Sequence, residues 1–202
     1  MKLYYSPGAC SLSPHIALRE AGLPFEAVAA PTKTHQLADG TDYYSINPLG
    51  YVPLLELDDG TRLREGPAIV QYIADQVPAK KLAPANGTMA RYQLQSWLTF
   101  IGTELHKSFG PLFSPATPDD VKAAAKDRIA GRLQWVEGEL AGKQHLMGDS
   151  FTVADGYLFT VTNWAPRVGL DLSAFTNLLA WRARVAARPA VVEAMKAEGL
   201  LK

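Results

Sequence analysis

Cysteine is almost absent from this sequence, because Cys10 is the only one among 202 residues. A single thiol cannot form a disulfide within the chain, which suits a reducing compartment. An excess of charge of one sign is also missing, since 20 Lys and Arg residues balance 20 Asp and Glu residues. This balance gives no global field of the kind that attracts nucleic acid or an anionic membrane.

Long apolar runs are lacking as well. The sequence has no stretch of about 18 apolar residues to span a bilayer, and its N-terminus has no apolar signal segment. The hydrophobic fraction of 48% and the charged fraction of 20% are ordinary for a globular protein with a buried core. We therefore expect a cytoplasmic protein with neither a membrane nor a nucleic acid as its partner.

The first third of the chain alternates between strand-like and helix-like segments. The predicted strands are residues 3–5, 25–29, 52–57 and 61–64, the last two joined by a tight hairpin turn. One helix is predicted to end near Gly22, and another to open at Pro67, because proline is tolerated in a first helical turn. This order of elements predicts a small α/β domain with a mixed sheet.

Helical spacing of apolar residues dominates the rest of the chain. One long helix is predicted from Met89 to about Phe113, where apolar side chains recur at intervals of three and four. Further helices are predicted to begin near Pro118, Thr152, Ser173 and Pro189. The second of these is predicted to run to about Val168 and to begin with a capping box formed by Thr152 and Asp155. We expect an α/β domain at 1–77, a linker at 78–88 and an all-helical domain at 89–202.

Cys10 lies where the first strand has turned and the first helix is about to begin. Unpaired backbone N–H groups and the positive end of the helix dipole face such a point, which biases a thiol toward thiolate. The same surroundings would hold the thiolate of a bound small molecule. The alternative is a small buried hydrophobic side chain, although Cys10 has Ala9 and Ser11 as neighbours rather than an apolar run.

Five motifs in order make the chain resemble the cytosolic glutathione transferases, most closely the bacterial beta class, over essentially its whole length. They are Lys2-Leu3-Tyr4-Tyr5-Ser6-Pro7-Gly8-Ala9-Cys10-Ser11, Asn47-Pro48-Leu49-Gly50-Tyr51-Val52-Pro53-Leu54-Leu55, Glu65-Gly66-Pro67-Ala68-Ile69, Glu104-Leu105-His106-Lys107 and Thr152-Val153-Ala154-Asp155. The resemblance implies a thioredoxin-like N-terminal domain, an all-α C-terminal domain, glutathione as co-substrate without a metal, and a homodimer.

At the start of the chain, the resemblance implies that Cys10 contacts the glutathione sulfur and can form a mixed disulfide with it. Since no second thiol is present, dithiol exchange is excluded and monothiol chemistry through glutathione is allowed. Tyr5 and Ser11 are candidate hydroxyl donors to the thiolate, because related classes use tyrosine or serine in that role. The structural alternatives are core packing for Tyr5 and helix capping for Ser11.

The resemblance also implies that the bond between Val52 and Pro53 is cis. The Val52 N–H and C=O would then pair with the cysteinyl backbone of glutathione, as in strand addition. Further on, His35 stands where the family usually has a lysine that reaches the glycyl carboxylate. Lys33 is the alternative for that contact, and a solvated loop position is the structural alternative for both side chains.

At the predicted helix start, backbone N–H groups of Glu65 and Gly66 would hold the γ-glutamyl carboxylate, and Glu65 would face the ammonium group. The family commonly has serine where this chain has Gly66. The backbone donor is retained and one hydroxyl contact is lost, which predicts somewhat weaker binding.

In the second domain, the resemblance places His106 toward the sulfur and the electrophile, with Lys107 beside it. Thr99 stands where the family often has an asparagine that contacts glutathione across the dimer interface. Thr103 and Glu104 are implied as weaker contacts on the same helix face. The structural alternative for these side chains is the edge of a solvated helix face.

The predicted activity is conjugation of the glutathione thiolate to an electrophilic carbon, which gives a thioether. The electrophile would bind in an apolar cleft between the domains, for which Tyr5, Phe109, Phe113 and Trp164 are candidate lining residues or, alternatively, core residues. Two other activities remain open. One is thiol transfer, peroxide reduction or reductive dehalogenation through a disulfide between Cys10 and glutathione, and the other is non-enzymatic binding of hydrophobic ligands.

Overall fold

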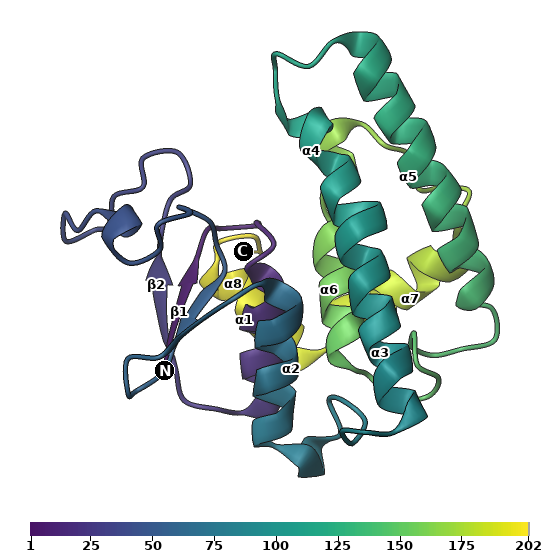
Figure 1. Cartoon of the computed structure of the whole chain (residues 1–202). Coiled ribbons are helices and arrows are strands. Elements are labelled where there is room, and N and C mark those ends of the chain that lie inside the picture. The colour runs from purple at the N-terminus through teal and green to yellow at the C-terminus, as the bar shows by residue number, and fades with distance from the viewer. Residues whose placement is uncertain (202) are drawn as a thin grey trace. The chain divides into compact units, whose positions relative to one another are not determined.

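The computed structural model describes residues 1–201, with a four-stranded sheet near the N-terminus and helices over most of the remaining chain (Figure 1). These residues form two compact units. The first unit contains residues 1–83 together with 187–201, and the second contains residues 84–186. Within residues 1–201, no helix is long and apolar enough to cross a membrane.

The sheet of the first unit is mixed, as the sequence predicted. Its strands are β1 (Lys2–Tyr5), β2 (Glu26–Ala29), β3 (Leu54–Glu56) and β4 (Arg62–Arg64), in the spatial order β2-β1-β3-β4. β1 is parallel to β2 and antiparallel to β3, so that Leu3 lies between Ala27 and Leu55 in the register. The completely buried Leu3 and Leu55 side chains anchor β1 and β3 in the core.

Three α-helices complete the first unit, namely α1 (Leu12–Ala21), α2 (Gly66–Gln76) and α8 (Pro189–Ala197). α1 ends at Gly22, which takes the left-handed conformation that glycine adopts without a steric penalty. The loop between β2 and β3 contains a short 3-10 helix, Tyr43–Ser45, and another, Pro78–Lys80, follows α2.

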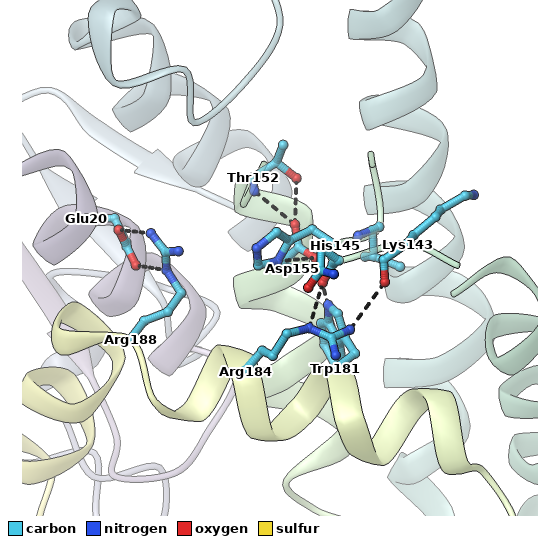
Figure 2. A network of polar contacts seen from close by, with 10 residues as sticks. Glu20, Lys143, His145, Thr152, Asp155, Trp181, Arg184 and Arg188 are labelled. Atoms are coloured by element: carbon cyan, nitrogen blue, oxygen red, sulfur yellow. Dashed lines mark hydrogen bonds and ion pairs between the residues drawn. The ribbon is translucent and has the colours of Figure 1, made fainter. Parts of the chain in front are cut away.

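α8 packs against α1, although the sequence-based division placed the last helix in the all-helical domain. A bidentate ion pair joins Arg188, just before α8, to Glu20 on α1, with 2.8 Å between Nη2 and Oε2 (Figure 2). Apolar periodicity identifies the buried face of a helix but not the element that covers it. The predicted all-helical domain at 89–202 therefore differs from the second unit of the structure, which contains residues 84–186.

The regular elements of the second unit are helices joined by loops. Its elements are α3 (Met89–Phe100), a π-helical segment (Ile101–His106), α4 (Lys107–Phe113), α5 (Asp119–Glu139), α6 (Val153–Thr162), a 3-10 turn (Pro166–Val168) and α7 (Thr176–Ala186). The long helix predicted from 89 to 113 is thus continuous in its path but contains a π-helical segment.

Two helix boundaries differ from their predictions. α6 ends at Thr162 rather than near residue 168, and a 3-10 turn at Pro166 follows it, because proline has no N–H to continue the α-helical ladder. α7 begins at Thr176 rather than near Ser173. The buried carboxylate of Glu137 on α5 accepts hydrogen bonds of 2.8 Å from the backbone N–H groups of Asn177 and Leu178, so a distant residue caps this helix.

The start of α6 has the predicted capping box. The Asp155 carboxylate accepts from the backbone N–H of Thr152 at 2.9 Å and from its hydroxyl at 3.1 Å. It also accepts at 2.9 Å from the backbone N–H of Leu146 and from the indole N–H of Trp181 (Figure 2). Asp155 is completely buried, so a single carboxylate ties together the loop before α6, the first turn of α6, and α7.

Candidate active site

Cys10 lies in the turn between β1 and α1, two residues before the helix begins. Its side chain is half-buried, and its Sγ is 3.2 Å from the carbonyl oxygen of Val52. The Val52–Pro53 bond is cis, in agreement with the expectation from the resemblance. Chain segments that are 42 residues apart in the sequence therefore bring a thiol and a backbone turn together.

Gly66, the first residue of α2, lies beside this turn. A Cβ atom built on Gly66 would be 3.9 Å from Cγ of Pro53, which is an ordinary contact distance. Glu65, immediately before it, is exposed and has a φ of +67°, a left-handed value that is uncommon for a side chain other than glycine. Cys10, Val52, Pro53 and Gly66 thus form a chain of neighbours at the starts of α1 and α2.

The hydroxyl of Ser11 supports the turn that carries Cys10. Its buried Oγ accepts from the Ser6 N–H at 3.1 Å and donates to the Ser6 carbonyl at 3.2 Å, and it does not cap α1. Tyr5 precedes this turn, with its ring 5.7 Å from that of His15. Burial, together with the negative charge of Glu198, raises the pKa of Tyr5, so its phenol keeps the proton. The roles of both hydroxyls toward a bound thiolate stay predictions.

Glu198 is a supporting residue that sequence reasoning missed. One carboxylate oxygen accepts from the backbone N–H of Gly8 at 2.9 Å, and the other is 2.9 Å from Nδ1 of His15. The side chains of His15 and Glu198 are completely buried. The contacts join residues more than 180 positions apart. A carboxylate beyond the end of a helix gives no sign of such a contact in a single sequence.

The loop between β2 and β3 holds the two candidates for the glycyl carboxylate. His35 has a φ of +54° and stacks on the ring of Tyr44 with 4.5 Å between the centroids. Lys33 is exposed. The loop is anchored near the cis bond by Asn47, whose side-chain amide donates to the Tyr51 carbonyl at 2.7 Å. Which of the two side chains contacts glutathione stays a prediction.

The π-helical segment of the second unit and the helices on either side of it carry the other predicted site residues. His106 is the last residue of the π-helical segment, and Nδ1 of His106 is 2.7 Å from the hydroxyl of Tyr157 on α6. Burial, with a smaller effect of the neighbouring positive charge of Lys107, lowers the pKa of His106 to about 4. The imidazole is therefore neutral at physiological pH, while Lys107 itself is exposed.

Thr99, Thr103 and Glu104 lie on the same helical path. Thr99 and Thr103 are exposed, and the hydroxyl of Thr103 donates to the Thr99 carbonyl at 3.0 Å. Glu104 forms an ion pair with Arg132 of α5, with 2.8 Å between Oε2 and Nε. A glutathione contact by Glu104 would therefore share its carboxylate with this pair.

Trp164 contacts three of the predicted aromatic and imidazole rings in the second unit. Its centroid is 4.9 Å from that of His106, 5.5 Å from that of Phe109 and 5.6 Å from that of Phe113. Phe109 is 1% exposed and belongs to the core, whereas Phe113 is 51% exposed. The cluster therefore offers an aromatic surface next to His106. Tyr5, the remaining predicted lining residue, belongs to the first unit.

A thiol at a helix start beside a cis-proline turn, on a mixed βαβ–ββα sheet, is the arrangement of a thioredoxin-like domain, here followed by a helical unit. Residues 8–76 match the family model for the N-terminal domain of glutathione S-transferase, and residues 100–189 match the one for its C-terminal domain. The chain belongs to the glutathione S-transferase family, as its motifs predicted.

Similar proteins extend over the whole chain. A glutathione S-transferase, GstA, from Escherichia coli O157:H7 is 46% identical over 99% of this chain and 100% of its own length. A sphingomonad glutathione S-transferase, solved in complex with glutathione, is 51% identical, with a TM-score of 0.96 and complete coverage of both chains. The beta-class enzyme of Sphingomonas chungbukensis is 50% identical, with the same TM-score and coverage. These similarities confirm the resemblance to bacterial beta-class enzymes.

Among residues 1–201, no group of three or more His, Cys, Asp or Glu side chains is arranged to hold a metal ion.

Proposed function

We propose that this chain conjugates glutathione, its co-substrate, to hydrophobic electrophiles. The observation that carries the proposal is the placement of the Cys10 thiol against the Val52 carbonyl at the start of α1. The thiolate of glutathione would attack an electrophilic carbon and form a C–S bond, while the displaced group leaves with its electron pair. The full-length similarity to a glutathione transferase solved with glutathione supports this activity.

Each site residue has a proposed task. In the first unit, Cys10 contacts the sulfur, with Tyr5 and Ser11 as hydroxyl donors near it. The Val52 backbone, next to Pro53, pairs with the cysteinyl residue. The helix start at Glu65 and Gly66 holds the γ-glutamyl group, because its N–H groups favour a carboxylate. His35 or Lys33 binds the glycyl carboxylate.

In the second unit, His106 and Lys107 serve the reaction itself. Thr99, Thr103 and Glu104 add weaker glutathione contacts. The protein would work as a homodimer, in which Thr99 reaches glutathione across the interface. Phe109, Phe113 and Trp164 supply aromatic surface for the electrophile. A cytoplasmic location completes the proposal, because a lone thiol suits a reducing compartment. A role in detoxification is proposed from the conjugation of electrophiles.

A second candidate activity is redox chemistry through Cys10. The half-buried thiol and the lack of a second cysteine suit a mixed disulfide with glutathione. Thiol transfer, peroxide reduction and reductive dehalogenation all pass through such a species. A non-enzymatic binder of hydrophobic ligands is the third candidate.

The test combines binding with turnover. Isothermal titration calorimetry of the reduced protein at neutral pH should detect glutathione binding at one site per chain. Assays with a chloroarene, a disulfide and a peroxide should then give the highest turnover with the chloroarene. Absence of glutathione uptake would refute all the glutathione-dependent candidates, and ligand uptake without turnover of any substrate would identify a binder.

Replacement of Gly66 by serine should strengthen glutathione binding. The site has room for the side chain, because a Cβ atom there makes its nearest contact at 3.9 Å. A hydroxyl that donates to the γ-glutamyl carboxylate adds one hydrogen bond to a charged group, so the Kd should fall by about tenfold. Gly66→Ala is the matched control for calorimetry, and equal affinities of the two variants would contradict the prediction.

A further inference from the structure

Tyr157, on α6, is the residue whose polar group contacts the His106 ring. It is almost completely buried and brings its hydroxyl to within 2.7 Å of Nδ1 of His106. The charged groups around this contact are few: Lys107 follows His106 in the chain, and Glu104 is paired with Arg132 of α5. None of these three side chains supplies the hydrogen bond to Nδ1.

The contact between Tyr157 and His106 can hold its proton in either of two ways. A distance of 2.7 Å is ordinary for a hydroxyl donor and lies at the short end of the range for a ring N–H donor. In the arrangement that we propose, the Tyr157 hydroxyl donates and Nδ1 accepts. A neutral imidazole that accepts at Nδ1 must carry its proton at Nε2.

Gly102 lies beside the contact between Tyr157 and His106. It is one turn before His106 in the π-helical segment, and a Cβ atom built there would be 3.5 Å from the Tyr157 hydroxyl, which is an ordinary contact distance. Such π-helical segments are frequent at functional sites.

We propose that Tyr157 is a positioning residue that holds His106 as a neutral imidazole with its proton on Nε2. His106 then serves conjugation as a hydrogen-bond donor to negative charge, on the sulfur or on the electrophile, and not as a general base. The proposal rests on the proposed participation of His106 in the reaction. What it adds is Tyr157, the residue that determines which ring nitrogen of His106 carries the proton.

Nitrogen-15 NMR of histidine-labelled protein tests the assignment directly. The chain has only four histidines, so the His106 signals can be assigned by comparison with a His106→Asn variant. In the wild-type protein, Nε2 should be protonated and Nδ1 should accept. In Tyr157→Phe, the ring should populate both neutral tautomers, and the signals of the other three histidines should be unchanged.

Kinetics provide the second readout. Tyr157→Phe should lower kcat for a chloroarene about fivefold at pH 7.5, the value of one neutral hydrogen bond. A donor to Nδ1 stabilises the neutral ring, so its loss raises the pKa of His106. Protonation restores a proton to Nε2, and the ratio of variant to wild-type kcat should therefore rise as the pH is lowered from 7.5 to 5.

The matched control is Tyr92→Phe, which removes the hydroxyl of an exposed tyrosine on α3 and should change neither readout. A wild-type His106 protonated at Nδ1, or a Tyr157→Phe protein with unchanged tautomer and unchanged kcat, would overturn the proposal. A wild-type protein without conjugating activity would instead refute the proposed function, while the NMR spectra would still decide what Tyr157 does.

Discussion

Replacement of Cys10 by alanine is expected to abolish the disulfide between the protein and glutathione completely. Cys10 is the only thiol in the chain, so no other residue can attack oxidised glutathione, form the mixed disulfide and release one glutathione thiolate. Thiol transfer and dehalogenation that pass through this species should be lost with it. Mass spectrometry of the intact protein after incubation with oxidised glutathione measures the adduct.

Conjugation should be reduced by the same substitution but not abolished. In the proposed site, the sulfur of Cys10 is one polar partner for the bound thiolate, and a hydrogen bond to a charged group is worth about 1.5–3 kcal/mol, or about 10- to 150-fold in rate. The control is Cys10→Ser, which keeps a donor and should retain more activity than the alanine variant. Unchanged chloroarene turnover in Cys10→Ala would show that the helix start alone holds the thiolate.

Asp155→Ala should cause the largest loss of stability among substitutions outside the proposed site. The buried carboxylate accepts from two backbone N–H groups, a hydroxyl and the indole of Trp181. Alanine would leave several buried donors without an acceptor, each at a cost of about 1–3 kcal/mol. Because these effects do not add fully, the free energy of unfolding should fall by about 3–5 kcal/mol.

Urea denaturation followed by circular dichroism measures this loss. Asp149, an exposed aspartate in the loop before α6, provides the control. Asp149→Ala should leave the midpoint almost unchanged. Asp155→Asn should have an intermediate effect, because an amide retains one oxygen acceptor but brings its own donors toward the buried N–H groups. Similar midpoints for Asp155→Ala and the wild-type protein would contradict the role given to the network.

Local sequence patterns were sufficient to predict most of the individual elements. Strand-like composition, apolar alternation at 25–29 and a tight hairpin turn predicted β1 to β4, and the Thr152–Asp155 spacing predicted the capping box at α6. The boundaries that differed depend on contacts made at long range. α7 begins where Glu137 of α5 caps it, and α8 packs on α1 of the first unit. Both contacts join positions far apart in the sequence, so a short stretch of sequence around α7 or α8 does not reveal them.

The candidate site shows the same division. The motif around Cys10 and the cis bond at Pro53 followed from the family resemblance, and the structure brings them together. Glu198 and Tyr157 were missed, because each contacts its partner from a position distant in the sequence, Glu198 just after α8 and Tyr157 on α6. A buried tyrosine on an apolar helix gives no sign that its hydroxyl faces a histidine 51 positions earlier.

The contacts of Glu198 have a consequence for how the protein is made. The turn that presents Cys10 is synthesised well before residue 198, so Gly8 and His15 acquire their carboxylate partner only when residue 198 has emerged from the ribosome. Contacts between such distant positions slow folding, since the intervening chain must be closed first. Nascent chains halted before residue 198 should therefore lack the Glu198 contacts that support the turn around Cys10, even though all four strands have already been synthesised.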